Sequence, residues 1–135
     1  MRNSILASAA ILLGAAIANS AAAADHAGEE LYTEACATCH GAAGMGEGPM
    51  AEFMSTNVPN LTLLSQENDG VYPMLKVIQT VDGRTGIRGH GSEMPVWGNQ
   101  FKAESVGDAG IYGAEVIVRG KMLSLALYVQ SLQAE

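Results

Sequence analysis

The chain is short of basic residues, cysteine and long apolar runs, and each shortage excludes a class of protein. Only 7 of its 135 residues are Lys or Arg, against 14 Asp and Glu, which gives a formal net charge of −7 at pH 7. Nucleic acids and anionic membrane surfaces are bound through clustered Lys and Arg, so we expect neither as a partner. With only two cysteines and three histidines, the chain also lacks the further ligands that a zinc site needs.

The first 24 residues have the pattern of a secretory signal peptide. A positive charge at Arg2 is followed by an apolar run over 5–17 and by three alanines at 22–24, a small-residue cleavage site before Asp25. The apolar run is shorter than the roughly 20 residues that span a bilayer, which disfavours a retained anchor. We therefore predict a signal peptide over 1–24 and one exported domain over 25–135, with a net charge near −8 because cleavage removes only Arg2.

The two cysteines stand in the segment Cys36-Ala37-Thr38-Cys39-His40. On a helix, at about 100° per residue, Cys36 and Cys39 share one face and His40 lies one turn after Cys36. Two thiols can then add to the two vinyl groups on one edge of a haem, while the imidazole approaches the iron. A thioredoxin-like redox pair would need a βαβ pattern, which is missing, and a plain disulfide would leave His40 unexplained. CxxCH is the sequence mark of c-type haem attachment.

Around this motif the chain resembles the class I c-type cytochromes, here of the bacterial periplasmic single-haem kind. Gly28 and Tyr32 lie eight and four residues before Cys36, where that family has a glycine and an aromatic residue on its first helix. The resemblance implies an all-α fold with three core helices and loops wrapped around one covalently bound haem c. It also implies that Gly28 and Tyr32 meet the last helix at Leu125 and Tyr128.

Two segments after His40 are expected to border the haem. The run 41–49 is rich in glycine and predicts a loop at the haem edge. Val58-Pro59-Asn60-Leu61 resembles the family segment whose proline carbonyl accepts a hydrogen bond from the haem histidine. Pro59 is thus a candidate to orient His40, and the alternative is a loop proline before a turn.

Two further helices are expected. The first runs from Asp69, as N-cap, to Gly83, with Pro73 in its first turn and an apolar face made of Val71, Met74, Leu75, Ile78 and Val81. The second starts between 113 and 120 and ends near Leu132. Its inner stripe comprises Met122, Leu125, Ala126, Val129 and Leu132.

The sixth iron ligand separates the possible functions. Met94 precedes Pro95 in a segment that resembles the family's axial-ligand loop, and the proline restricts Met94 to extended backbone. The rival is His90, which would give a bis-histidine site. Weaker candidates for contacts with the haem edge or the propionates are Trp97, Arg84 and Arg88.

With His40 and Met94 as metal ligands, the iron has no open position, so we predict an electron carrier that is not itself an enzyme. The cofactor-binding residues are then Cys36, Cys39, His40 and Met94, with Pro59 and Trp97 beside them. Two alternatives stay open: a haem-based sensor or small-molecule binder with a labile sixth ligand, and the cytochrome subunit of a periplasmic oxidoreductase. We expect a periplasmic monomer, redox protein partners of unknown identity, and no stable membrane insertion after signal cleavage.

Overall fold

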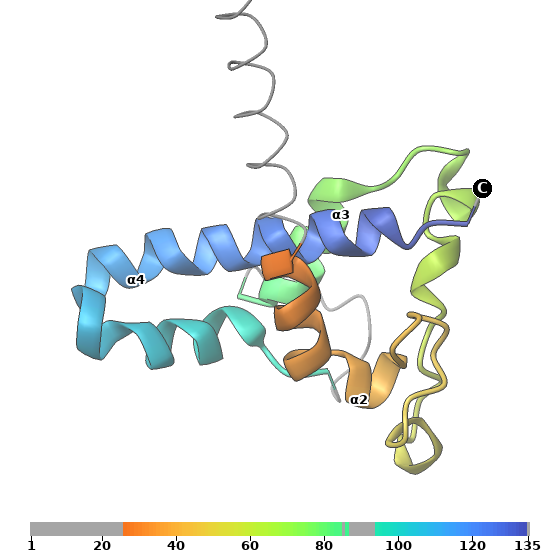
Figure 1. Ribbon diagram of the computed structural model, residues 1–135, viewed down its shortest axis with the longest axis horizontal. Helices are drawn as coiled ribbons and strands as arrows, with labels where there is room; N and C mark the ends of the chain where they lie inside the picture. Colours follow the sequence, from red (N-terminus) through yellow and green to blue (C-terminus); the bar gives the residue numbers. More distant parts are fainter. Residues whose placement is uncertain (1–25, 85, 87–93, 135) are drawn as a thin grey trace, which may run out of the picture.

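The computed structural model describes residues 26–84, 86 and 94–134, and within these the regular structure is entirely helical (Figure 1). Residues 26–35 form the first helix. It is followed by α2 (Ala37–His40), three 3-10 turns and two longer helices. The turns are η1 (Ala51–Phe53), η2 (Leu61–Leu63) and η3 (Gln66–Asn68), and the helices are α3 (Met74–Asp82) and α4 (Trp97–Ser131). The predicted all-α fold is confirmed.

The first helix crosses the C-terminal part of α4 at Gly28, as predicted. A Cβ on Gly28 would overlap the carbonyl oxygen of Ser124 and lie 2.8 Å from the Cβ of Tyr128. One turn later, the ring of Tyr32 lies 5.2 Å from the ring of Tyr128 and is only 1% exposed. Leu125 belongs to the same buried cluster. The missing side chain at Gly28 therefore permits the close approach of two helix backbones, and the two tyrosines cover the contact.

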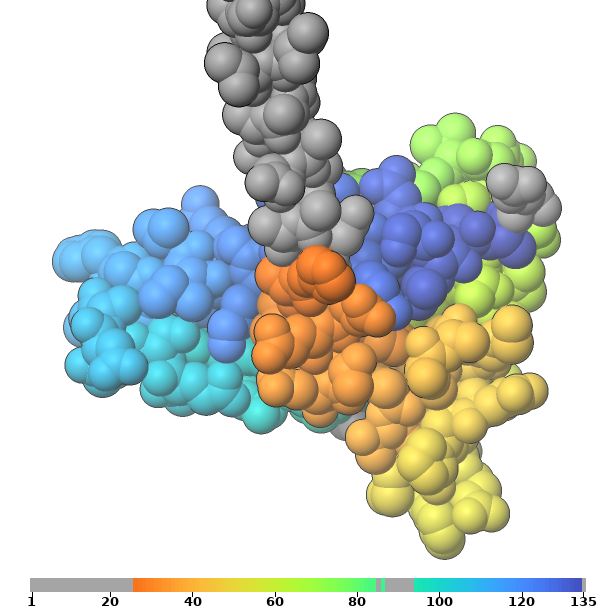
Figure 2. Space-filling view, viewed as in Figure 1, coloured from red at the N-terminus to blue at the C-terminus, as the bar shows by residue number. Residues whose placement is uncertain are grey.

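Helix α4 is a helical hairpin whose two arms meet at Gly110. This residue has φ 68° and ψ 176°. These values lie outside the helical region, and residues with a side chain rarely adopt them. Figures 1 and 2 show the arms, 97–109 and 111–131, folded back against each other. The prediction that this helix starts between 113 and 120 was wrong. The second arm starts at 111. The first arm was missed because it has no clear apolar stripe, and Phe101 is its one large apolar residue that is buried.

Helix α3 also begins later than predicted. Asp69 has φ 54° and ends the 3-10 turn η3, so it cannot serve as the N-cap of a helix. The helix starts at Met74, directly after Pro73, and Gly83 closes it with φ 68°, as predicted. Of the expected apolar face, Ile78 and Val81 pack against the core. Val71 and Leu75 instead are 65% and 67% exposed, because Val71 precedes the helix and Leu75 lies on its outer side.

The core lies where the first helix meets both arms of α4. Its buried residues include Tyr32, Phe101, Val118, Met122, Leu125 and Val129, and Cys36 belongs to the same cluster. The cysteine motif therefore starts at the edge of the core. Within the described ranges, no helix combines the length and apolar character needed to cross a membrane.

Candidate haem-binding site

The CxxCH motif forms a helical turn directly after the first helix, with Cys36 as the N-cap of α2. The amide of Cys36 donates to the carbonyl of Tyr32 at 2.8 Å, and the amide of His40 donates to the carbonyl of Cys36 at 2.9 Å. Cys36 and His40 are each 8% exposed, and Cys39 is partly exposed. Both thiols are free, with no disulfide between them. The helical spacing predicted for these three side chains is confirmed.

Two adjoining cavities, of about 370 and 290 Å³, lie against this turn. Five residues line both cavities: Cys36, His40, Asn57, Pro59 and Met94. The larger cavity reaches the core at Leu125 and Val129, and the smaller one extends past Cys39 to Trp97. Cofactor sites are typically concave and mostly apolar, with a few convergent polar groups, and this space fits that description. The structure thus brings all six predicted cofactor-binding residues to one connected space.

Pro59 lies beside His40, as the sequence predicted. The Nδ1 of His40 is 3.4 Å from the carbonyl oxygen of Pro59, a long hydrogen bond. A carbonyl only accepts, so this contact favours the tautomer with the proton on Nδ1, in which Nε2 carries the lone pair that can bind a metal. The next residue, Asn60, accepts a hydrogen bond from the amide of Thr62 at 2.9 Å and fixes the turn that follows Pro59.

The glycine-rich loop after His40 packs closely on both the motif and the Pro59 segment. A Cβ on Gly46, which has φ 84°, would lie 2.5 Å from the carbonyl oxygen of Val58. A Cβ on Gly48 would lie 2.5 Å from the carbonyl oxygen of Thr38 and 2.6 Å from the carbonyl carbon of Cys39. Neither site has room for a side chain. The loop predicted over 41–49 is confirmed, and it holds Pro59 in place against His40.

Burial gives the two thiols different environments. Desolvation, and secondly the neighbouring thiol of Cys39, raises the pKa of Cys36 to about 12. An unmodified Cys36 is therefore a neutral thiol at physiological pH, and neutral thiols are poor partners in disulfide exchange. This environment fits a cysteine that ends as a thioether to a buried group better than it fits a redox-active pair.

Met94 and the first turn of α4 also border the cavities. Met94 is partly buried and borders both cavities, and Pro95 and Trp97 line the smaller one. The indole ring of Trp97 stacks on Phe101, with centroids 5.5 Å apart. The rival ligand His90, and Arg88, lie outside the described residues.

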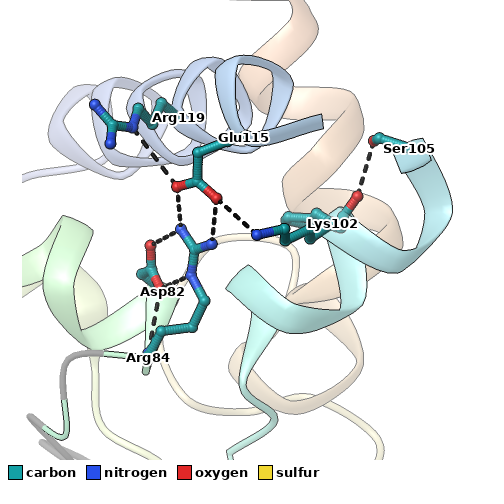
Figure 3. A network of polar contacts seen from close by, with 7 residues as sticks. Asp82, Arg84, Lys102, Ser105, Glu115 and Arg119 are labelled. Carbon is teal, nitrogen blue, oxygen red and sulfur yellow. Dashed lines mark hydrogen bonds and ion pairs between the residues drawn. The ribbon is translucent and has the colours of Figure 1, made fainter. Parts of the chain in front are cut away.

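Arg84, proposed above for a propionate, is held by two carboxylates instead (Figure 3). Its Nε and Nη2 donate to Asp82 at 2.6 and 2.7 Å, and its Nη1 and Nη2 donate to Glu115 at 2.8 and 3.1 Å. These hydrogen bonds hold the pKa of Asp82 below its usual range and lower that of Glu115 to about 2. Sequence reasoning missed this network, since nothing in the pattern pairs residues 31 positions apart.

The donor set fits a haem c. Two free thiols lie on the cavity wall one turn apart, a histidine with an oriented ring projects from the same helix, and a thioether reaches the cavity from another segment. Comparison with known proteins agrees with this assignment. Residues 23–112, which are 90 of the 135, match the family model described as cytochrome C oxidase, cbb3-type, subunit III. No curated protein and no solved structure gave a significant match.

Proposed function

The chain belongs to the family of cytochrome c oxidase, cbb3-type, subunit III, and from this premise we propose that it is an exported, single-haem electron carrier with His40 and Met94 as axial ligands. The family is one of c-type cytochromes, so the chain binds haem c covalently. We assign the two thioether bonds to Cys36 and Cys39. Export follows from the signal peptide proposed for residues 1–24, and N-terminal sequencing of the purified protein should begin at Asp25.

One observation carries the proposal: Cys36, His40 and Met94 border the same two adjoining cavities although Met94 is more than 50 residues from the motif. Met45 and Met50, in contrast, are 53% and 43% exposed and line neither cavity. Met54 lines only the smaller one. These positions support Met94 as the methionine that would hold the haem iron together with His40.

Electron transfer without further chemistry is what this ligand set supports. The haem iron supplies a one-electron change of oxidation state. An iron held by both His40 and Met94 would have no site left for oxygen, peroxide or a substrate. A thioether ligand also favours the ferrous state relative to a second nitrogen donor and so raises the reduction potential. Pro59 fixes the His40 ring, which limits the ligand movement that accompanies each transfer.

The optical spectrum of the haem-loaded protein tests the ligand assignment. We expect the oxidised wild type to show the weak near-infrared band of sulfur-to-iron(III) ligation, and Met94→Ala to lose it. Met45→Ala is the matched control, because it removes an exposed thioether from the haem-edge loop and should keep the band. Absence of the band in the wild type, its survival in Met94→Ala, or rapid carbon monoxide binding by the ferrous wild type would each count against the carrier and favour a sensor.

A second candidate is that the chain is the cytochrome subunit of an oxidoreductase complex. The family's description as an oxidase subunit favours this possibility. The two candidates share the same haem site and differ only in what the protein is bound to. Size-exclusion chromatography of gently prepared native extracts separates them. A carrier elutes at the size of a 14.0 kDa chain or smaller, whereas a subunit elutes with a large complex.

A further inference from the structure

Met94 lies on a segment whose two ends are packed against each other. The segment leaves α3 at Gly83 and Arg84 and enters α4 at Trp97. A Cβ on Gly83 would lie 3.3 Å from the Cα of Val96, so the two backbones are in contact. The ends of this closed loop therefore form a stem, which we define as residues 82–84 and 96–98. Met94 is two residues from the stem.

Side chains make a second contact between the two halves of the stem. A Cβ on Gly98 would overlap the Oδ1 of Asp82 and lie 2.5 Å from the Nε of Arg84. The paired Asp82 and Arg84 side chains thus rest directly on the backbone of the first turn of α4. That turn has no side-chain cap at Val96. An ion pair, rather than a capping residue, covers the entrance to this helix.

Glu115 anchors the stem to the second arm of α4. Its carboxylate accepts two hydrogen bonds from Arg84 and lies 3.4 Å from the Nζ of Lys102 and 3.6 Å from the Nε of Arg119 (Figure 3). Lys102 comes from the first arm of α4 and Arg119 from the second. The side chains of Asp82, Arg84 and Glu115 are only 16%, 22% and 29% exposed. A two-pronged contact to a guanidinium at this burial has a defined geometry, unlike most surface ion pairs.

We propose that Arg84 and Glu115 are positioning residues for the sixth ligand: their ion pair locks the stem of the Met94 loop to α4 and thereby strengthens the bond between Met94 and the haem iron. The inference rests on the His40/Met94 ligation proposed above. A ligand on a loop must give up conformational freedom when it binds, and a closed stem has already removed part of that freedom. Loosening the stem leaves the thioether unchanged but makes its binding less favourable.

Competition by imidazole measures the strength of the Met94 bond. Imidazole can occupy the sixth position of the ferric protein only when Met94 leaves, so a weaker Met94 bond gives tighter apparent imidazole binding. The test variant is Glu115→Gln, which keeps the shape of the side chain and removes its charge. We expect it to bind imidazole roughly three- to tenfold more tightly than the wild type, the range expected for a partly buried ion pair. Arg84→Lys, which loses the two-pronged contact, should change in the same direction.

Glu104→Gln is the matched control. Glu104 pairs with Lys121 at 3.4 Å across the same two arms of α4 but contacts neither half of the stem. Glu104→Gln removes the same charge as Glu115→Gln. Comparing the two variants therefore separates the effect of a loosened stem from the general electrostatic effect of a lost carboxylate on the iron. We expect its imidazole affinity and its reduction potential to stay near those of the wild type, whereas Glu115→Gln should have a lower potential.

The near-infrared band provides a second measurement, because it reports the Met94 bond apart from the fold. On heating, Glu115→Gln should lose the band at a lower temperature than the wild type, with a smaller change in the unfolding followed by circular dichroism. Wild-type imidazole affinity in both Glu115→Gln and Arg84→Lys would overturn the inference, as would an equal change in Glu104→Gln. If the wild type itself lacks the band, the proposed ligation fails first, and that outcome is seen before any stem variant is compared. Should Glu115→Gln not mature, Glu115→Asp, which keeps the charge and shortens the reach, is expected to show the same change at smaller size.

Discussion

Replacing Gly28 by alanine tests whether the crossing of the first and last helices is as close as the structure has it. The added methyl group would overlap the carbonyl oxygen of Ser124 and lie 2.8 Å from the Cβ of Tyr128. Both are atoms of, or directly attached to, the backbone of α4, so no side-chain rotation relieves the overlap. Extra carbon in a packed interface costs about 1–3 kcal/mol, and a Gly→Ala change within a helix returns up to about 1 kcal/mol.

Because the overlap is with backbone atoms, the packing cost lies in the upper part of this range, and the net loss expected for Gly28→Ala is about 1–2 kcal/mol. A domain of this size loses about 4 °C in Tm for each kcal/mol. Thermal unfolding of the haem-loaded protein by circular dichroism measures this directly. A urea titration should show a lower midpoint with an unchanged slope, because the variant alters stability rather than compactness. A shift of the first helix at Gly28 should also move the haem site, since Cys36 lies about two turns further along the chain.

Gly120→Ala is the opposite-sign control for this prediction. Gly120 is exposed in the second arm of α4, and a Cβ there would meet nothing within 4 Å. Only the helix propensity changes, so this variant should be more stable than the wild type by about 0.5–1 kcal/mol. If Gly28→Ala is as stable as the wild type, or if both variants shift in the same direction, the close crossing at Gly28 is refuted.

Two further predictions concern charge. Because the hydrogen bond from Arg84 lowers the pKa of Glu115 to about 2, the stability that this carboxylate contributes is present above about pH 4.5 and is lost as the pH falls towards 2. Urea unfolding across this range should therefore show the wild type and Glu115→Gln differing most above pH 4.5 and converging near pH 2; a constant difference would contradict the assigned pKa. Residues 26–75 carry seven acidic side chains and no Lys or Arg, and Glu34 lines the cavity that also includes Cys39. We therefore expect electron exchange with a basic redox protein to slow as salt is added. Stopped-flow rates for Glu34→Gln should depend less on salt than those of Glu104→Gln, and equal slopes would place the docking face elsewhere.

The parts of the site that were predictable from the sequence depend on local spacing. Cys36, Cys39 and His40 lie within one helical turn, and helix geometry alone places them on one face. Gly28 and Tyr32 were found from their fixed offsets to Cys36, because the amide of Cys36 still donates to the carbonyl of Tyr32 at the end of the first helix. These residues lie near one another in sequence and in space.

The errors arose where local pattern and tertiary packing disagree. Asp69 has the residue type of an N-cap, but its backbone is left-handed and ends a 3-10 turn. The first arm of α4 has few apolar residues, because it is buried mainly through Gly98, Phe101 and Ser105. A glycine and a serine carry no hydrophobic periodicity, and the close packing that explains them appears only in three dimensions. The bend at Gly110 was likewise invisible, since an exposed glycine within a helical run has no unique sequence signature.

The two sides of the haem site are consequently built by different means, and variants should separate accordingly. On the His40 side, the ring, Pro59 and the glycines at 46 and 48 lie within 20 residues, and their contacts are made as the loop folds back on the motif. On the Met94 side, the proposed ligand follows a stem joined through Arg84 to Glu115, which lies 31 residues away and beyond the bend of α4. Disturbing the first set should impair haem attachment or the orientation of His40. If Met94 is the sixth ligand as proposed, disturbing the second should leave the haem attached and change how firmly that ligand is held. The reduction potential should then change through substitutions in α4 that leave the CxxCH motif intact.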